Sequence, residues 1–317
     1  MTDVFSFGEP MVEFCATNVG KLEDVQTFRR GWGGDTSNFA VAVARLGGSC
    51  GYVCRIGDDG FGKSLLELWR REGVDASQVV IERGGYTAVY FISLLPDGQH
   101  DFTYFRKGSA ASHYSPSDLD AESLMRAKLF HTSGITLALS ESCREAALKG
   151  AEIVKGSGGL FSFDVNYRPK LWPQEIARPR IEEAVAKADL VFASREDFGN
   201  LYARDAGDAV ERIRSVYEPK LIVIKLGSEG CLVVAGGEKV LVPGFKVAAV
   251  DATGAGDAFD GAFVLGFLKG WSLKKTATFA NAVGALSTTG LGAVEPIPAL
   301  REVEDFLRSK GVESSYP

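Results

Sequence analysis

The chain of 317 residues has few of the side chains that build disulfide frameworks or zinc sites. Cysteine occurs five times and histidine three times. The number of cysteines is odd, and the closely spaced Cys50 and Cys54 lack a second pair of metal ligands. A disulfide-stapled secreted fold and a structural zinc site are therefore disfavoured, and a reduced, cytoplasmic compartment fits best.

The sequence also lacks long apolar runs and an excess of basic residues. No apolar stretch approaches the roughly 18 residues that span a bilayer. The N-terminus shows no basic region followed by an apolar one, so we expect no secretory signal. Lysine and arginine together number 35 against 41 acidic residues, a formal net charge of -6. Nucleic acids and anionic membranes bind basic surfaces, so neither is an expected partner.

Short apolar runs rich in β-branched residues alternate with longer stretches of helical periodicity. The expected strands are Val4–Phe7, Tyr52–Ile56, Leu129–His131, Leu160–Asp164, Asp189–Ala193 and Leu221–Lys225. Such alternation predicts one α/β domain over residues 1–317, with a mostly parallel central sheet covered by helices on both faces. Ligands of these sheets bind beyond the carboxyl ends of the strands.

Two regions interrupt this alternation. Residues 221–250 predict a meander of successive strands at one end of the sheet, and Thr87–Arg106 predicts a long hairpin that turns at Pro96-Asp97-Gly98. Together with the segment near residue 12 to residue 32, the hairpin predicts a small β-sheet lid, with segments at about 12–32 and 86–107. A three-residue turn pairs residues whose numbers sum to 194, which places Tyr90 opposite Tyr104.

Residues 57–64, Gly-Asp-Asp-Gly-Phe-Gly-Lys-Ser, match the pattern GxxxxGK[ST] of a phosphate-binding loop. A phosphate cradle works through backbone N–H groups and positive potential. Asp58 and Asp59 would place two carboxylates in that cradle and repel a triphosphate. We therefore interpret the segment as a tight connection between a strand and a helix.

A second glycine-rich segment has the composition that an anion site needs. Asp251-Ala252-Thr253-Gly254-Ala255-Gly256-Asp257 follows a strand and opens an apolar helix. Gly254, Ala255 and Gly256 let backbone N–H groups approach an anion at a helix N-terminus. Asp257 stands in the first turn, where it can accept the proton of an attacking hydroxyl. The spacing alone is equally compatible with an aspartate that caps the helix.

These residues, together with Gly33-Gly34-Asp35-Thr36-Ser37-Asn38 and the helix ending at Leu46-Gly47, resemble the ribokinase (PfkB-type) carbohydrate kinases. The likeness runs from Gly8-Glu9 to Gly292-Ala293. It implies a ribokinase-like α/β fold with a β lid, ATP as donor, Mg²⁺, and a sugar hydroxyl as acceptor. It implies Asp257 as the base and residues 254–256 as the anion hole. Ala252 departs from the family pattern outside that hole.

Within the family, the chain resembles 2-keto-3-deoxygluconate kinases in residues 104–111, 131–140 and 164–172. The resemblance implies contacts of Tyr90, Tyr104, Arg106 and Arg168 with the bound acid or the phosphates. The residues themselves agree, because a guanidinium is a natural receptor for a carboxylate. Arg106 can equally be a solvated hairpin charge, and Arg168 can be a loop salt bridge.

The resemblance assigns further positions by their place in its motifs. The implied substrate-binding residues also include Gly34, Asn38 and Asp251. The implied nucleotide-binding residues are Asn166, Ser194, Lys225, Gly227, Ser228, Gly230 and Asn281. Lys225 can instead be a strand-end charge, and Asn281 a polar helix position. The family's Asn-x-x-Glu, associated with magnesium and phosphate, is Ser194-Arg195-Glu196-Asp197 here, so whether Asp197 or Glu196 helps to hold Mg²⁺ stays open.

The sequence thus predicts a kinase that phosphorylates the terminal hydroxyl of 2-keto-3-deoxygluconate to give 2-keto-3-deoxy-6-phosphogluconate. The alternative within the family is a fructokinase or another neutral-sugar kinase, for which Arg106 would lack a partner. A non-catalytic sensor would have lost the base, and a nicotinamide enzyme needs more than the one glycine of Gly8-Glu9-Pro10-Met11. We also expect a homo-oligomer, a dimer or a multiple, that buries the aromatic lid. A monovalent cation such as K⁺ would sit at Thr289–Gly292, but nothing in that loop decides the matter.

Overall fold

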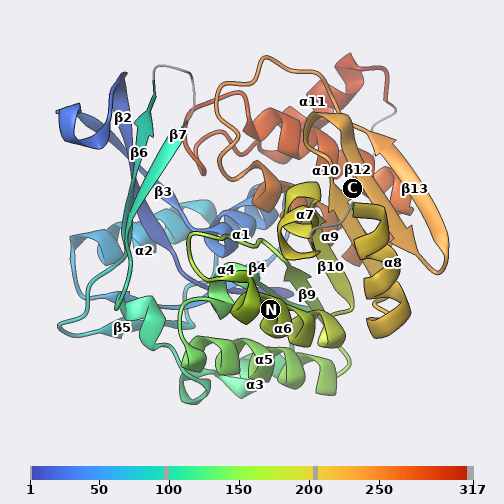
Figure 1. Ribbon diagram of the computed structural model, residues 1–317, viewed down its shortest axis with the longest axis horizontal. Coiled ribbons are helices and arrows are strands. Elements are labelled where there is room, and N and C mark those ends of the chain that lie inside the picture. Colours follow the sequence, from blue (N-terminus) through green and yellow to red (C-terminus); the bar gives the residue numbers. More distant parts are fainter. Residues whose placement is uncertain (1, 96–99, 203–205, 313–317) are drawn as a thin grey trace.

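The computed structural model describes residues 2–95, 100–202 and 206–312 (Figure 1). A nine-stranded sheet forms its centre, in the order β13-β12-β11-β10-β9-β8-β1-β4-β5. The strands from β11 to β5 are parallel to one another. At the other end of the sheet, β12 pairs antiparallel with β11, and β13 pairs antiparallel with β12. The strands are β1 (Val4–Phe7), β4 (Cys50–Gly57), β5 (Val79–Glu82), β8 (Leu129–Ser133), β9 (Leu160–Asp164), β10 (Leu190–Ser194), β11 (Leu221–Lys225), β12 (Gly230–Ala235) and β13 (Glu238–Pro243).

Helices cover both faces of this sheet, and each face has its own hydrophobic core. One face is covered by α1 (Asp35–Arg45), α2 (Gly60–Glu72), α9 (Ala255–Leu268), α10 (Leu273–Ser287) and α11 (Leu300–Ser309). The other is covered by α3 (Ala121–Met125), α5 (Glu141–Gly156), α6 (Gln174–Lys187), α7 (Arg195–Tyr202) and α8 (Ala206–Tyr217). Short turns of helix occur at α4 (Gly134–Leu137), η1 (Leu22–Asp24), η2 (Ala110–His113), η3 (Pro116–Asp118) and η4 (Gly227–Glu229). None of the helices in the described ranges is long and apolar enough to cross a membrane.

A separate four-stranded sheet stands at the left in Figure 1, away from the β12–β13 edge. Its order is β3-β2-β6-β7, with β2 (Met11–Val19), β3 (Phe28–Gly33), β6 (Val89–Leu94) and β7 (His100–Phe105). The outer pairs are antiparallel, whereas β2 and β6 are parallel. The sequence predicted a small sheet from these two segments.

The predicted hairpin register is confirmed, because Tyr90 pairs with Tyr104 and Leu94 pairs with His100. The turn residues Pro96-Asp97-Gly98 lie outside the described residues. The meander at residues 221–250 is present as β11, β12 and β13, although its last strand ends at Pro243. The mostly parallel sheet between two helical layers, with the smaller sheet beside it, is the ribokinase-like α/β fold that the sequence predicted.

The segment at residues 57–64 is a capped helix start and not a phosphate cradle. Asp59 is the N-cap of α2, and its Oδ1 atom accepts a hydrogen bond of 2.7 Å from Gly62 N. Its Oδ2 atom accepts another from Thr87 N at 2.7 Å, and these donors lower the pKa of Asp59. The carboxylate therefore takes the N–H groups that an anion would need, and the interpretation from sequence is confirmed.

Candidate active site

The first turn of α9 has the backbone geometry of an anion site. Gly254 precedes the helix with φ 76°, and a Cβ atom there would lie 2.7 Å from Ala293 O. Glycine is therefore required at this position by both conformation and space. Ala255 N donates to Ala252 O, and Ala258 N donates to Gly254 O. Between them the helix begins with N–H groups that have no intrahelical acceptor, as every α-helix does.

Asp257 follows directly in this turn and is held by α1. Asn38 donates a hydrogen bond of 2.9 Å from Nδ2 to Asp257 Oδ2. Burial, followed by the charge of Asp35, raises the pKa of Asp257 to about 8, and the Asn38 hydrogen bond opposes this rise. A carboxyl with its pKa near the working pH is the kind of group that general base catalysis uses.

Asp35, the first residue of α1, is the carboxyl whose charge acts most strongly on Asp257, and it was not among the site residues predicted from the sequence. Its Oδ2 atom accepts hydrogen bonds from Ser133 Oγ at 2.5 Å and from Asn166 Nδ2 at 3.1 Å. Its Oδ1 atom is buried without a hydrogen-bond partner among the described residues. Asn166, expected beside the nucleotide, therefore contacts a carboxyl that acts on Asp257, and its backbone has φ 33°. The Oδ1 atom of Asp35 is thus a hydrogen-bond acceptor without a donor among the described residues.

Lys225 lies at the end of β11 beneath the same turn. Its Nζ atom is 2.9 Å from Asp164 Oδ2 and 2.9 Å from Asp260 Oδ2, and both carboxylates are buried. A Cβ atom at Gly256 would lie 3.4 Å from this ammonium. The sequence expectation for Lys225 was a phosphate contact or a strand-end charge. The structure gives it two carboxylate partners close to the proposed anion hole.

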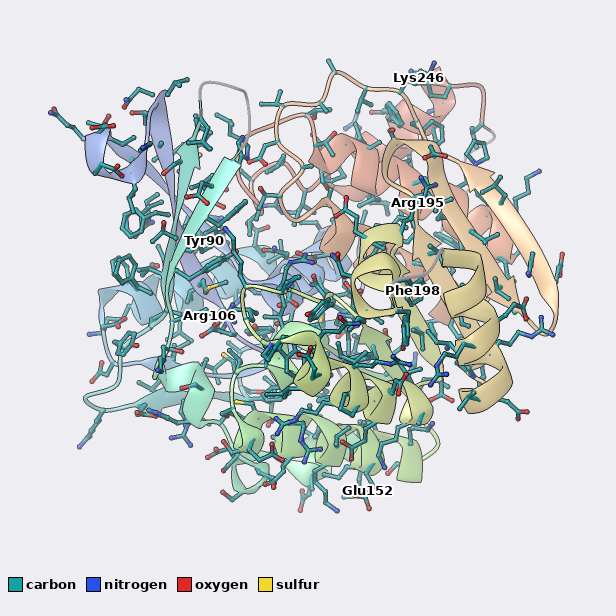
Figure 2. The ribbon with its side chains drawn as sticks, viewed as in Figure 1. Tyr90, Arg106, Glu152, Arg195, Phe198 and Lys246 are labelled. Atoms are coloured by element: carbon teal, nitrogen blue, oxygen red, sulfur yellow. The ribbon has the colours of Figure 1, made fainter. Side chains whose placement is uncertain are left out.

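The small sheet turns an aromatic face toward this region, on which Figure 2 labels Tyr90 and Arg106. The rings of Tyr90 and Tyr104 stack with centroids 5.8 Å apart, and the Arg106 guanidinium lies 5.7 Å from the Tyr104 ring. Arg106 also forms an ion pair of 2.5 Å with Glu9, a buried residue that follows β1. Ser109 Oγ donates to Glu9 at 2.7 Å. Burial raises the pKa of Glu9, and Arg106 and Ser109 act against that rise.

Glu13 on β2 links the small sheet to the loop that follows α10. The Tyr90 hydroxyl donates to Glu13 Oε2 at 2.5 Å. Burial raises the pKa of Glu13 to about 7, and the charges of Asp251 and Glu295 add to that rise. Asp251 itself accepts hydrogen bonds from Thr253 N and Gly292 N, both at 2.9 Å. It thereby shapes the approach to the first turn of α9.

The positions expected beside the nucleotide surround the ends of β10 and β11. Ser194 N and Oγ both donate to Asp197 Oδ2 at 2.7 Å, and Tyr167 N donates to Asp197 Oδ1 at 2.8 Å. Asp197 thus satisfies the start of α7, and its carboxylate is occupied by backbone and hydroxyl donors. Arg168 is half exposed, with one nitrogen 3.8 Å from Asp197 Oδ1.

The loop between β11 and β12 has glycines where the backbone requires them. Gly227 and Gly230 have φ 61° and 107°, and a Cβ atom at Gly230 would lie 2.1 Å from Val242 O. Ser228 lies between them in η4. Asn281 on α10 donates to Val242 O at 3.1 Å and to Pro243 O at 3.2 Å. Its amide fastens β13 to α10 in this structure, and the expected nucleotide contact stays a prediction.

The structure thus brings most of the predicted substrate residues close to Asp257. Gly34 is the N-cap of α1. It has φ 101°, and a Cβ atom there would lie only 2.3 Å from Glu9 O, so the position requires glycine. From the helix that begins here, Asn38 reaches Asp257. Besides Asp35, the sequence did not identify four buried carboxyls that share the site. They are Glu9, Glu13, Asp164 and Asp260. Each is a charged residue within or beside an apolar element, which is a signal that the sequence carries.

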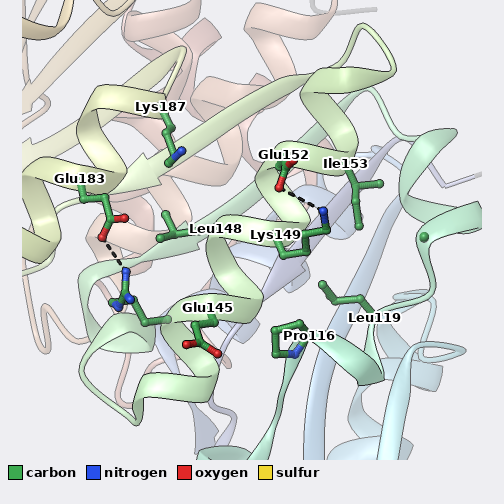
Figure 3. Close-up of a pocket in the computed structure, with 11 residues that line it drawn as sticks. Pro116, Leu119, Glu145, Leu148, Lys149, Glu152, Ile153, Glu183 and Lys187 are labelled. Atoms are coloured by element: carbon green, nitrogen blue, oxygen red, sulfur yellow. Dashed lines mark hydrogen bonds and ion pairs between the residues drawn. The ribbon is translucent and has the colours of Figure 1, made fainter.

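A surface hollow between α5, α6 and the segment 116–121 is separate from this site (Figure 3). Four of its charged residues are paired, since Arg144 binds Glu183 at 2.6 Å and Lys149 binds Glu152 at 3.1 Å. None of the residues that line the hollow is one of those described around Asp257. Within the described residues, no group of three metal-ligating side chains occurs.

The fold and this site define a sugar kinase of one family. The model of the "pfkB family carbohydrate kinase" matches residues 1–300, and the chain belongs to that family. Among curated proteins it is similar to "Fructokinase-1" of Zea mays, with 38% identity over 95% of this chain and 96% of the relative. The kinase resemblance drawn from the sequence is confirmed at the level of the family.

The chain is also similar to two proteins with solved structures. An Escherichia coli protein solved in complex with ATP and Mg²⁺ has a TM-score of 0.90 and 28% identity, over 98% of this chain and 100% of that one. A 2-dehydro-3-deoxygluconokinase of Thermotoga maritima has a TM-score of 0.89 and 25% identity, over 97% and 100%. The special closeness to 2-keto-3-deoxygluconate kinases that the sequence predicted is therefore not confirmed, because the similar curated relatives include fructokinases with higher identity.

Proposed function

We propose that this chain transfers the terminal phosphoryl group of ATP to the terminal primary hydroxyl of a neutral ketose, with fructose as the first candidate. The proposal keeps the reaction predicted from the sequence and replaces the sugar acid by its stated alternative. Support comes from the fructokinases among the relatives, which are 33–38% identical and match nearly the whole chain. It comes above all from the ion pair between Arg106 and Glu9.

That ion pair removes the main argument for an acidic substrate. The sequence reasoning held that the Arg106 charge would have no partner beside a neutral sugar. This expectation is wrong, because the buried Glu9 carboxylate lies 2.5 Å from the guanidinium. A sugar acid would have to compete with Glu9 for Arg106 and leave a second carboxylate buried beside it, which is costly in a low-dielectric site. A neutral sugar leaves the pair intact.

The residues fit the phosphates of a nucleotide at the first turn of α9. Gly254 allows the backbone to turn into α9 against Ala293, and Gly256 leaves space beside the Lys225 ammonium that a side chain would fill. Bound ATP with Mg²⁺ supplies the transferable phosphoryl group and neutralises part of its charge. Because Ala255 N already donates to Ala252 O, the backbone N–H groups of Gly254 and Gly256 are the members of the predicted anion hole that would stabilise the transferring oxygens. Gly227, Ser228 and Gly230 would border the rest of the nucleotide.

Asp257 acts as the base in this proposal. Asn38 fixes its carboxyl orientation through the hydrogen bond at 2.9 Å. Asp35 and Asn38 lie on α1 beside it, so the free Oδ1 atom of Asp35 would accept a second sugar hydroxyl and align the first for attack. Tyr90 and Tyr104 would pack against the sugar from the small sheet. Mg²⁺ would be held mainly by phosphates and water, since Asp197 is already engaged by three donors.

A sugar acid such as 2-keto-3-deoxygluconate is the second candidate. Arg168 favours it, because its guanidinium is half exposed, and its nearest carboxylate oxygen, on Asp197, is 3.8 Å away. A carboxylate approaching from solvent could bind this charge without displacing Glu9. The structural likeness to a 2-dehydro-3-deoxygluconokinase is compatible with this candidate.

The two candidates are separated by a coupled ADP-release assay with ATP and Mg²⁺ over fructose, other neutral hexoses, ribose and 2-keto-3-deoxygluconate. We expect kcat/KM to be highest for fructose or another neutral ketose. A value at least about 10-fold higher for the sugar acid would correspond to about 1.4 kcal/mol in its favour and would overturn the proposal. Mass spectrometry of the product locates the phosphate on the terminal oxygen.

We further propose that the chain is a homo-oligomer through the outer face of the small sheet. This face carries Phe14, Phe28, Phe91 and Phe105, whose rings contact each other at centroid distances of 5.1–5.8 Å. Phe105 is 56% exposed. The other three rings are half-buried, and an aromatic cluster that is partly exposed to water is a typical site of subunit contact.

A further inference from the structure

The Lys225 ammonium joins the ends of two strands to the helix that carries the base. Its two partners are Asp164, at the end of β9, and Asp260, on α9, each with Oδ2 at 2.9 Å. The exposed fractions of the three side chains are 15%, 4% and 1%. The second oxygen of each carboxyl has no hydrogen-bond partner among the described residues. The ammonium is thus fixed from two sides, and both carboxyls depend on it.

This arrangement places a positive charge against the first turn of α9. A Cβ atom at Gly256 would lie 3.4 Å from Lys225 Nζ. Asp260 lies three residues after Asp257, so both face the same side of the helix. The groups that act on Asp257 from the surrounding elements are Asp35 and Asn38 on α1, Asp164 on β9 and Lys225 on β11. Lys225 carries the positive charge in this set.

We propose that Asp164 and Asp260 are positioning residues, which hold the Lys225 ammonium where its charge favours the ionised, proton-accepting form of Asp257. The inference rests on the role proposed above for Asp257. Without the two carboxylates, the flexible lysine side chain has many other positions, most of them farther from the turn. With them, the charge of Lys225 partly offsets the effects of burial and of the Asp35 charge on the ionisation of Asp257.

The first test measures the titration of Asp257 in the ligand-free protein. Carboxyl carbon NMR of protein labelled at aspartate follows the titration, and the signal that disappears in Asp257→Asn identifies the residue. We expect Lys225→Met to move the titration midpoint of Asp257 to higher pH, because a stabilising positive charge is lost. The matched control is Lys155→Met. Lys155 lies 3.3 Å from Asp189, which directly precedes β10, whereas Lys225 lies at the carboxyl end of the neighbouring strand β11.

An unchanged Asp257 midpoint in Lys225→Met would overturn the proposal, as would an equal shift in Lys155→Met. This readout does not depend on turnover. If the wild-type protein phosphorylates no sugar, the proposed function fails while the titration still decides whether Lys225 acts on Asp257. The two failures are therefore distinguishable.

The second test asks whether Asp260 acts by holding the lysine. Asp260→Asn keeps an oxygen that can accept from Lys225, whereas Asp260→Ala removes it. We expect Asp260→Ala to lower kcat by about 10-fold or more at neutral pH, with KM for the sugar changed less than about 2-fold. Asp260→Asn should restore kcat to within about 3-fold of wild type.

This pair also decides the matter if Lys225→Met fails to fold, because the Asn variant preserves shape and hydrogen bonding. Wild-type kcat in Asp260→Ala, or an equal loss in the Ala and Asn variants, would contradict a positioning role. Urea unfolding midpoints of both variants show whether a loss of kcat follows from a loss of stability. If it does, kcat of the Ala variant should recover at lower temperature. Such a recovery would show that the proposal is wrong.

Discussion

The carboxylate of Glu9 and the guanidinium of Arg106 form a buried ion pair of 2.5 Å between the large sheet and the small sheet. Glu9 follows β1, and Arg106 follows β7, so the pair fastens the sheet across the strand ends. The exposed fractions of the side chains are 0% and 11%. The charge of Arg106 is therefore balanced before any substrate binds, and under the proposed function this balance favours neutral over acidic sugars.

Removing the negative partner should shift the preference toward sugar acids. Glu9→Gln keeps the shape of the side chain but leaves the Arg106 charge for a substrate carboxylate, which is a strong hydrogen-bond partner. We expect the ratio of kcat/KM for 2-keto-3-deoxygluconate to that for fructose to rise by about 10-fold or more. The control is Glu82→Gln, which breaks the ion pair of 3.1 Å with Arg55 outside the site. An unchanged ratio in Glu9→Gln would show that Arg106 does not read the substrate charge.

Asp257→Asn should abolish most of the transfer while keeping the fold. The amide keeps the shape and the contact with Asn38 but cannot accept the hydroxyl proton. We expect turnover to fall by roughly 10²–10⁴-fold at saturating substrate, the usual contribution of a general base. ATP binding, measured by calorimetry, should be largely retained. A variant that keeps more than about a tenth of the wild-type turnover would exclude Asp257 as the base.

The same substitution should change how stability depends on pH. The pKa of Asp257 rises from 3.8 to about 8 on folding, mainly because of burial. Between these values the folded state holds a proton at Asp257 that the unfolded state has lost, so the contribution of Asp257 to the stability of the wild-type protein falls as pH rises from about 4 to about 8. Asp257→Asn has no such proton. We expect its unfolding free energy, relative to wild type, to increase by more than about 1 kcal/mol between pH 5 and pH 8 in urea titrations without ligand. A decrease would contradict the raised pKa.

Gly254→Ala should cost more than its backbone conformation alone explains. Gly254 and Gly73 have similar φ angles of 76° and 74°. A Cβ atom at Gly254 would lie 2.7 Å from Ala293 O, whereas a Cβ atom at Gly73 would have no other atom within 4 Å among the described residues. Gly73→Ala should lose roughly 1–2 kcal/mol of unfolding free energy from the left-handed conformation. Gly254→Ala should lose more, and its turnover should also fall, because the first turn of α9 must shift. Equal stability losses with normal turnover would mean that the turn is tolerant.

Assembly through the small sheet can be tested at its exposed aromatic residue. Light scattering at micromolar concentration should give a mass of at least twice 34.0 kDa. Phe105→Glu should shift the protein toward the monomer, because it places a charge in an apolar contact. Tyr86→Glu nearby, at 44% exposure, tests whether the effect extends beyond the ring cluster. A wild-type protein that is a monomer at these concentrations would refute the proposal.

Much of the architecture follows from local patterns in the sequence. Leu160–Asp164 and Leu221–Lys225 are strands with the predicted bounds, because short apolar runs between helical segments can only be buried strands here. The turn geometry at Gly254 and the register of Tyr90 with Tyr104 follow from glycine and hairpin rules. β5 and α11 were not predicted, since β5 is half-buried at the sheet edge and shows little periodicity.

The charges of the site could not be placed from the sequence. Glu9 and Arg106 lie far apart along the chain, and so do Asp164 and Lys225. Which acid neutralises which base depends on strand order, and the order β11-β10-β9-β8-β1 brings together ends that no local pattern connects. For this reason the Arg106 charge was interpreted as free for a substrate, although the fold gives it a partner.

The parallel pairing of β2 with β6 has a consequence for how the small sheet is made. Val12 pairs with Val89, so the hairpin of β2 and β3 emerges from the ribosome well before the strand that completes it. A two-stranded hairpin is marginally stable in water, and distant pairing partners slow folding. Until β6 has been synthesised, the edge of β2 that pairs with it therefore has no strand partner. The small sheet can thus be completed only when the chain has been made through β7, after β4 and β5 of the large sheet.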